Sequence, residues 1–331
     1  MAGPPRLTPG GRATIIDVAA AAGVSRQTVT RAMNGMSGIS AATKDRVLQA
    51  AAALDYRPSR FGRGLVTGGD HQLGLVVNDL RNPYAPALAS AVLGLAAARG
   101  WNVMLADVGL ASDSDRMVES LGAQTDVVIG YLGSRAPEWI ERLGSVPVVE
   151  LDPSGPVTRA AVRIDPTAAI EDLADHLVDV GVKHPVVLDG VPSQRGEHMV
   201  AALRRRGYLP DLVVASAPTA EAGAGQTERI LAEHRRVDAV LAFNDVLALG
   251  VLSACRRAGV DVPGDVRVVG VDGLPLGTLV APTLTTLAVD LDEVAGQALD
   301  LALGMLAGEL PRSGEAVERT VRHRLLLRES A

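Results

Sequence analysis

Short apolar runs that alternate with amphipathic stretches are the feature that most constrains the fold of this 331-residue chain. The runs begin near residue 72 and are rich in Val, Leu and Ile, which is typical of strands buried on both faces of a parallel sheet. The candidate strands are Leu73–Val77, Val103–Ala106, Val127–Tyr131, Val146–Leu151, Pro185–Leu188, Val213–Ala215, Ala239–Phe243, Val266–Val271 and Leu284–Val289. Helical stretches such as Pro86–Arg99, Thr167–Val180 and Thr227–His234 separate several of them. The alternation predicts an α/β body with doubly wound parallel sheets, and its length favours two lobes.

The charge of the chain is distributed unevenly. Residues 1–66 carry nine basic and three acidic residues, a net charge of +6, while the remainder carries 23 basic and 35 acidic residues, a net charge of −12. The net charge of −6 for the whole chain therefore conceals a small basic head before a large acidic body. A basic head is attracted to the phosphates of a nucleic acid, whereas an acidic body is repelled by them.

The basic head is predicted to be all-α. Its helices are expected over Ile15–Ala22, Arg26–Met33 and about Ala41–Leu54. Thr14, Ser25 and Ser40 precede these helices and are residue types that cap helix N-termini. The first two helices are joined by a turn that contains Gly23, so together they form a helix-turn-helix. In such a unit the second helix enters the major groove of DNA and its N-terminal residues reach base edges.

The second predicted helix carries side chains suited to base recognition. Arg26, Gln27 and Thr28 lie in its first turn, and Arg31 lies one turn later. Arg and Gln can make bidentate hydrogen bonds to the edges of guanine and adenine, respectively. The alternative is a charged, solvated surface helix, but the turn, the caps and the local positive charge favour a DNA-reading helix.

The head also resembles a known family. The run TIIDVAAAAGVSRQTVTRAMNG, followed by ISAATKDRVLQAAAALDYRPSR, is similar to the DNA-binding head of LacI-type transcriptional repressors. The resemblance implies that Arg26, Gln27 and Arg31 read bases. It implies that a second group of residues mostly positions the head on phosphates: Thr14, Ser25, Thr28 and Asn34. The head would span residues 14–57, after a disordered extension at residues 1–13.

Residues 58–71 are expected to form the hinge or linker between head and body. In the resembling family this segment becomes a short helix when two heads meet on operator DNA, and a leucine from each wedges into the minor groove. Leu65 occupies that position here. Gly62 and Gly64 depart from the family pattern, and each Gly costs about 1 kcal/mol relative to Ala inside a helix. A flexible linker therefore stays open as the alternative.

The resemblance continues through the body to the end of the chain. The segments LGLVVNDLRNPY, AVLAFNDVLALGVL, VRVVGVDGLPLG and RHRLLLRES are similar to LacI-family segments in the same order. They imply an effector-binding and dimerisation domain over residues 72–331 with a two-lobe, periplasmic-binding-protein-like fold. Lobe one would comprise about 72–165 and 290–317, and lobe two about 166–289 and 318–331.

Polar residues follow several of the predicted strands, where ligands bind in open α/β sheets. By position in the resembling family, the expected effector-binding residues are Asn78, Tyr84 and Asp152 from the first lobe and Arg195, Phe243, Asn244 and Asp272 from the second. Tyr84 and Phe243 are expected to pack against an apolar face of the ligand. Asp245 is interpreted instead as the residue that begins the following helix.

The nature of the effector is less constrained than the site. Carboxylates and amides beside a guanidinium suit the vicinal hydroxyls of a sugar, but Arg195 could equally bind a carboxylate or phosphate. Sugar sites usually include an aromatic face, and the chain has only eight aromatic residues. A carbohydrate or sugar derivative is favoured over a nucleobase or other metabolite, and the choice between inducer and corepressor stays open.

Other functional classes have little support. The six His residues form no His-Glu-x-x-His pair, no Gly-x-Ser-x-Gly or phosphate-binding Gly-x-x-x-x-Gly-Lys motif occurs, and the single Cys excludes a Cys-rich zinc site. We therefore expect no enzyme activity, no cofactor and no metal, with a solute-binding receptor or a sugar-modifying enzyme as remote alternatives. We expect a cytoplasmic homodimer on a pseudo-palindromic operator, since neither a secretory signal nor an added tetramerising segment is evident.

Overall fold

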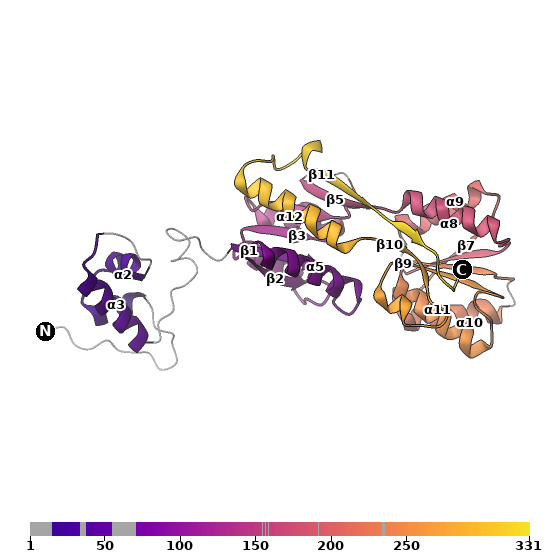
Figure 1. Ribbon diagram of the computed structural model, residues 1–331, viewed down its shortest axis with the longest axis horizontal. Coiled ribbons are helices and arrows are strands. Elements are labelled where there is room, and N and C mark those ends of the chain that lie inside the picture. The colour runs from indigo at the N-terminus through magenta and orange to yellow at the C-terminus, as the bar shows by residue number, and fades with distance from the viewer. Residues whose placement is uncertain are drawn as a thin grey trace. The chain divides into compact units, whose positions relative to one another are not determined.

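The computed structural model describes residues 15–33, 38–54, 71–153, 155, 157, 159–190, 192–233 and 236–331 (Figure 1). The chain divides into two units, Met1–His71 and Gln72–Ala331, and each is treated by itself. Some predictions lie outside the described residues: the extension at 1–13, nearly all of the hinge at 58–71, and the roles of Thr14, Asn34 and Leu65.

The head consists of the predicted helices α1 (Ile15–Ala22), α2 (Arg26–Met33) and α3 (Ala41–Ala53). Each helix contributes one fully buried valine, Val18, Val29 and Val47, to a small shared core. Gly23 has a φ of 63°, which permits the tight turn between α1 and α2. The predicted cap of α3 is confirmed, because the Ser40 hydroxyl accepts a hydrogen bond from the Thr43 amide at 3.2 Å. The predicted helix-turn-helix is therefore present.

Within the described residues, the first sheet of the body has six strands in the order β11-β5-β4-β3-β1-β2. They are β1 (His71–Val77), β2 (Trp101–Asp107), β3 (Val127–Gly130), β4 (Val148–Leu151), β5 (Ala160–Asp165) and β11 (Glu318–Arg322). The strands from β11 to β1 are parallel to one another. One face is covered by α5 (Tyr84–Ala98) and α12 (Leu291–Ala307), the other by α6 (Ser114–Gly122) and α7 (Ala136–Leu143).

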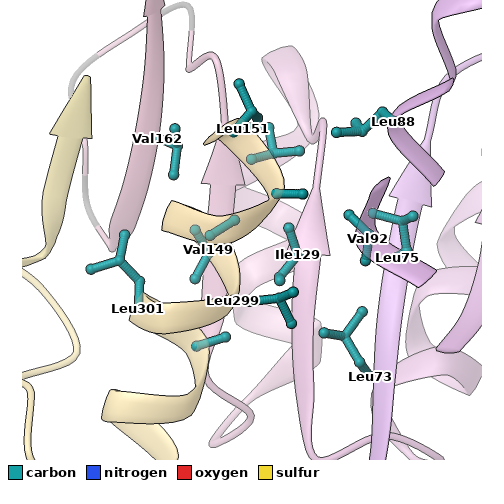
Figure 2. Close-up of a cluster of buried hydrophobic side chains, with 14 of the residues drawn as sticks. Leu73, Leu75, Leu88, Val92, Ile129, Val149, Leu151, Val162, Leu299 and Leu301 are labelled. Atoms are coloured by element: carbon teal, nitrogen blue, oxygen red, sulfur yellow. The ribbon is translucent and has the colours of Figure 1, made fainter. Parts of the chain in front are cut away.

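The main core of this lobe lies between the sheet and the pair α5 and α12. Figure 2 shows Leu75, Ile129 and Val149 of the strands beside Leu88 of α5 and Leu299 of α12, all fully buried. Complete burial of a side chain of this size contributes about 1.5–3 kcal/mol relative to exposure. This core fixes the carboxyl ends of β3 and β4, from which two of the site residues described below emerge.

The second sheet has the order β12-β10-β9-β8-β6-β7 among the described residues. Its strands are β6 (Pro185–Asp189), β7 (Asp211–Val214), β8 (Ala239–Ala242), β9 (Arg267–Asp272), β10 (Thr285–Ala288) and β12 (Arg324–Leu326). All pairs are parallel except β12 with β10. Helices α8 (Thr167–Asp179) and α9 (Gln194–Arg205) cover one face, while α11 (Asp245–Ala258), backed by α10 (Ala220–Ala232), covers the other (Figure 1).

The chain crosses between the two sheets at three places in its described part. It leaves the first sheet after β5 and returns to it after β10, where α12 begins. The third crossing lies at His323, between β11 of the first sheet and β12 of the second. The expected crossing at about Glu318 was wrong, because Glu318–Arg322 pair in parallel with β5 and remain in the first lobe. None of the described helices is both long and apolar enough to cross a membrane.

Candidate effector cleft and DNA-reading helix

Helix α2 has one buried and one exposed face. Val29 and Ala32 are buried in the core of the head, whereas Arg26, Gln27 and Arg31 are exposed. The three side chains predicted to read bases therefore lie on the solvent side of the helix. This is the arrangement that a recognition helix needs to insert into a major groove.

One of the residues expected to bind phosphates, Ser25, also caps α2. The Ser25 hydroxyl accepts a hydrogen bond from the Thr28 amide at 3.1 Å and lies 2.9 Å from the Thr28 hydroxyl. This confirms the prediction that Ser25 caps the helix.

In the first lobe, Tyr84 begins α5 and is paired with a second tyrosine. Its hydroxyl lies 2.6 Å from that of Tyr131, and the two rings meet edge to face with centroids 6.1 Å apart. Burial raises the pKa of the Tyr84 phenol, and the hydrogen bond with Tyr131 lowers it. Three nearby charges also act on this pKa: those of Asp272 and Asp152 raise it, and that of Arg195 lowers it. Four of the predicted site residues therefore lie within electrostatic reach of one another across the two lobes.

Asp152 directly follows β4 and has an unusual backbone, with a φ of 45°. Its amide donates to the Val162 carbonyl at 2.8 Å, and its carboxylate accepts from the Ile164 amide at 3.3 Å. The side chain is exposed to solvent, yet the surrounding protein desolvates it enough to raise the pKa of the carboxyl. Asp152 is therefore both open to solvent and close to surrounding protein, as a residue on the wall of the expected cleft would be.

In the second lobe, Arg195 is the second residue of α9. Its Nη1 donates to the Phe243 carbonyl at 2.8 Å, and its guanidinium carbon lies 4.9 Å from the centroid of the Phe243 ring. Ser193 caps the helix, and its amide and hydroxyl donate to the buried carboxylate of Asp189 at 3.0 Å and 2.9 Å. The short loop before Arg195 is therefore closed by internal hydrogen bonds, and one face of Phe243 is covered by the guanidinium.

Asp272 ends β9, with 7% of its surface exposed and a φ of 117°. Burial raises the pKa of its carboxyl to about 8, against the lowering influence of Arg195, and the charge of Asp245 raises it further. At neutral pH the carboxyl thus holds a proton for most of the time in the free protein. It can then donate as well as accept a hydrogen bond.

The two asparagines of the prediction are placed differently. Asn244 is the N-cap of α11, and its Oδ1 accepts from the Leu247 amide at 2.8 Å. Its Nδ2 is buried without a hydrogen-bond partner among the described residues, so this donor is unused. Asn78 follows β1 and is exposed, in a loop that Asp107 holds through the Leu80 amide. Among the described residues, Asn78 takes no part in the interactions that join the other predicted site residues.

Three residues near the cleft were not predicted to belong to it. Tyr131 directly follows Gly130 at the end of β3, so the rule that identified Asp152 could have found it. His323 has 4% of its surface exposed, and its Nδ1 is buried without a partner in the described structure. Burial lowers the pKa of its imidazole to about 4, and the charge of Arg195 lowers it further. Asp245 begins α11 as expected, directly after the Asn244 cap, but its carboxylate is also completely buried.

The interactions described above thus join two carboxyls, two phenols and one guanidinium from both lobes, a set suited to a polar organic ligand. No group of three or more His, Cys, Asp or Glu in the described ranges is arranged to hold a metal ion. Two surface hollows lie elsewhere, one of about 630 Å³ beside β2 and α6 and one of about 790 Å³ beside β7 and α10. Neither is lined by the residues of the cleft.

Comparisons with known proteins agree with this architecture. Residues 14–59 match the family described as "Bacterial regulatory proteins, lacI family", and residues 174–331 match the "Periplasmic binding protein-like domain". The HTH-type transcriptional regulator reg1 of Streptomyces lividans is 36% identical over 82% of this chain and 84% of its own length.

Solved structures give the same assignment. A LacI family transcriptional regulator from Arthrobacter sp. FB24, in complex with lactose, is 38% identical with a TM-score of 0.76 and covers 80% of this chain and 100% of its own. The lac repressor dimer bound to operator and the anti-inducer ONPF is 26% identical with a TM-score of 0.76, over 97% of this chain and 99% of its own. With a helix-turn-helix head, a two-lobe body and relatives of this similarity along most of its length, the chain belongs to the LacI family of DNA-binding transcriptional regulators, which are not enzymes.

Proposed function

We propose that this regulator represses transcription as a homodimer on a pseudo-palindromic operator, and that a small carbohydrate in the cleft between the lobes controls its operator affinity. The observation that carries the effector part is the set of Tyr84, Tyr131 and Asp152 from one lobe facing Arg195 and Asp272 from the other. A relative of 38% identity is known in complex with lactose, which supports a sugar at the equivalent place. We place the protein in the cytoplasm, with the DNA that it binds.

The chemistry of the cleft favours a neutral polyol. Asp152 can offset the charge of the single guanidinium, and Asp272 keeps a proton at neutral pH, so the site has little net positive charge to attract an anionic effector. The hydroxyls of a sugar can donate to Asp152 and accept from Arg195 and from either tyrosine. A nucleobase, the alternative, would need a free aromatic face, and one face of Phe243 is already covered by Arg195.

Control of DNA binding would follow from the position of the cleft. A ligand held by residues of both lobes stabilises the arrangement in which the lobes are close, and it can change operator affinity only if it binds the two arrangements differently. The coupling is reciprocal, so operator DNA must change the affinity for the sugar by the same factor. Two symmetric heads would then read two half-sites through α2.

The test combines two measurements on the full chain. A thermal-shift screen against neutral mono- and disaccharides, sugar phosphates and nucleosides identifies the effector, because a ligand of the folded body must raise the melting temperature. Fluorescence anisotropy with the DNA upstream of its own gene then measures operator affinity with and without the compound that stabilises most. A neutral sugar that changes operator affinity supports the proposal. A nucleoside or an anion as the best compound, or turnover of a sugar without DNA binding, contradicts it.

A further inference from the structure

Behind Asp272, a buried hydrogen-bond network joins α11, the loop after β9 and strand β10. The Asp245 carboxylate, which is completely buried, accepts from the Leu274 amide at 2.6 Å and from the Thr286 hydroxyl at 2.6 Å. The same hydroxyl accepts from the Gly273 amide at 3.2 Å. The two residues that follow Asp272 in the chain are therefore both held through their amides.

This network surrounds a backbone conformation that is unfavourable in itself. Asp272 has a φ of 117° and is followed by Gly273 with a φ of 79°. A positive φ in a residue with a side chain persists only where the surrounding structure enforces it, and such residues cluster at ligand sites. Because the amides of Gly273 and Leu274 are fixed, the peptide that leaves Asp272 cannot rotate to the ordinary extended conformation without breaking hydrogen bonds.

Two neighbouring glycines leave the space that this hydrogen-bond network occupies. A Cβ on Gly270 of β9 would overlap the Oδ1 atom of Asp245, and a Cβ on Gly273 would overlap the side chain of Ala288. Small residues on β9 and its exit loop thus leave room for the Asp245 carboxylate and for the close approach of β10.

We propose that Asp245 and Thr286 are positioning residues for the effector site: they hold Asp272 in the backbone conformation that presents its carboxyl to the cleft. The proposal rests on the proposed function, since it assumes that Asp272 binds the effector. Neither residue needs to touch the ligand, and their contribution passes through the amides of Gly273 and Leu274. Strand β10 also provides a matched control, because Thr285 is equally buried and its hydroxyl interacts with the Arg328 backbone instead.

The experiment compares Thr286→Val, which removes the hydroxyl, with Thr286→Ser, which keeps it, and with Thr285→Val as the control. The first readout is hydrogen exchange by mass spectrometry in a peptide that spans Val271–Thr278, which requires no ligand. The second is the affinity for the saccharide that most stabilises the wild type in the panel above. Operator affinity without saccharide is measured in each variant to show that the heads function.

We expect Thr286→Val to accelerate exchange in this peptide and to weaken saccharide binding about tenfold, with operator affinity within twofold of the wild type. Thr286→Ser should restore both, and Thr285→Val should lose stability without either effect. Unchanged exchange and saccharide affinity in Thr286→Val, or equal losses in Thr285→Val, would overturn the proposal. If Thr286→Val does not fold, Thr286→Ala removes the same hydroxyl and is judged by the same criteria.

The Asp272→Ala variant, which removes the polar group, separates this proposal from the function on which it rests. Loss of saccharide binding in Asp272→Ala with normal binding in Thr286→Val contradicts only the positioning role. Unchanged binding in Asp272→Ala contradicts the effector site itself. Hydrogen exchange in the Val271–Thr278 peptide needs no ligand, so it tests whether the network holds this backbone whichever of these binding results is found.

Discussion

Asp152 and Asp272 are the two residues with a side chain whose φ is positive in the described chain, 45° and 117°. Each such conformation costs about 1–3 kcal/mol, and both residues emerge from the carboxyl end of a central strand. The rule that ligands bind at strand ends predicted both positions from sequence, but it could not predict the strain. Nor could it predict that Asp245 supports Asp272, because that relation depends on contacts with β10, 41 residues further along the chain.

The buried carboxyl of Asp272 makes the stability of the protein depend on pH. Burial raises its pKa from 3.8 to about 8, so the folded state keeps a proton that the unfolded state has released. The stabilisation is complete below pH 3.8 and is lost as the pH rises to 8. We expect Asp272→Asn to be more stable than the wild type at pH 9 by an amount on the order of a few kcal/mol, and much closer to it at pH 4.

Urea unfolding of both proteins at several pH values measures this difference. Contributions from groups that do not interact with Asp272 are common to both proteins and cancel in the comparison. A difference in stability that stays constant from pH 4 to pH 9 would show that the carboxyl is not desolvated in the folded state.

Arg195 is expected to be the main hydrogen-bond donor to the effector. Arg195→Ala should weaken saccharide binding about 10- to 150-fold, because a hydrogen bond to a charged group contributes about 1.5–3 kcal/mol. Operator binding without saccharide should stay intact, and release by saccharide should be lost. Arg205→Ala provides the control, since Arg205 lies on the same helix and pairs with Glu171 at the surface. Retained induction in Arg195→Ala would exclude this role.

Among the secondary-structure elements, the helices of the head were predicted to within one residue, whereas β5, β11 and β12 were not predicted. The head helices carry local signals, namely Ser caps and Gly turns, which act within a few residues. Strands β11 and β12 lie at sheet edges and mix Arg and Glu with apolar residues, so they lack the continuous apolar run of a central strand. Helix α10 begins at Ala220, seven residues before its predicted start, because Thr219 caps a first turn of small residues that has no clear apolar period.

Helix α2 is the element on which sequence recognition should depend. Gln27→Ala should lower affinity for the operator about 5- to 150-fold, the loss of about 1–3 kcal/mol expected for a bidentate base contact. Affinity for random DNA should change little. Gln49→Ala, an exposed glutamine on α3, is the matched control in the same unit. Equal losses on operator and random DNA would assign Gln27 to phosphate binding, and anisotropy with both duplexes distinguishes the two outcomes.

For the molecule as a whole, the separation of charge predicts different responses to salt for the two ligands. Operator binding by the basic head should weaken steeply, by about 10³- to 10⁵-fold between 50 and 200 mM salt if six to ten phosphates are contacted. Binding of a neutral sugar in the acidic body should change little over the same range, since no ions are released. Titrations of both ligands at four salt concentrations measure the two slopes. A steep slope for the effector would indicate an anionic ligand and contradict the carbohydrate assignment.

The three crossings between the sheets have a consequence for how such proteins diversify. The head is a single uninterrupted segment, Met1–His71, whereas each lobe is assembled from separate segments and β11 and β12 are joined through His323 alone. One recombination event near the junction of the two units would transplant DNA specificity to another body intact. No single event can transplant a lobe. The head and the whole body can therefore be exchanged as modules, whereas effector choice within one body must change by substitutions among the residues of the two lobes.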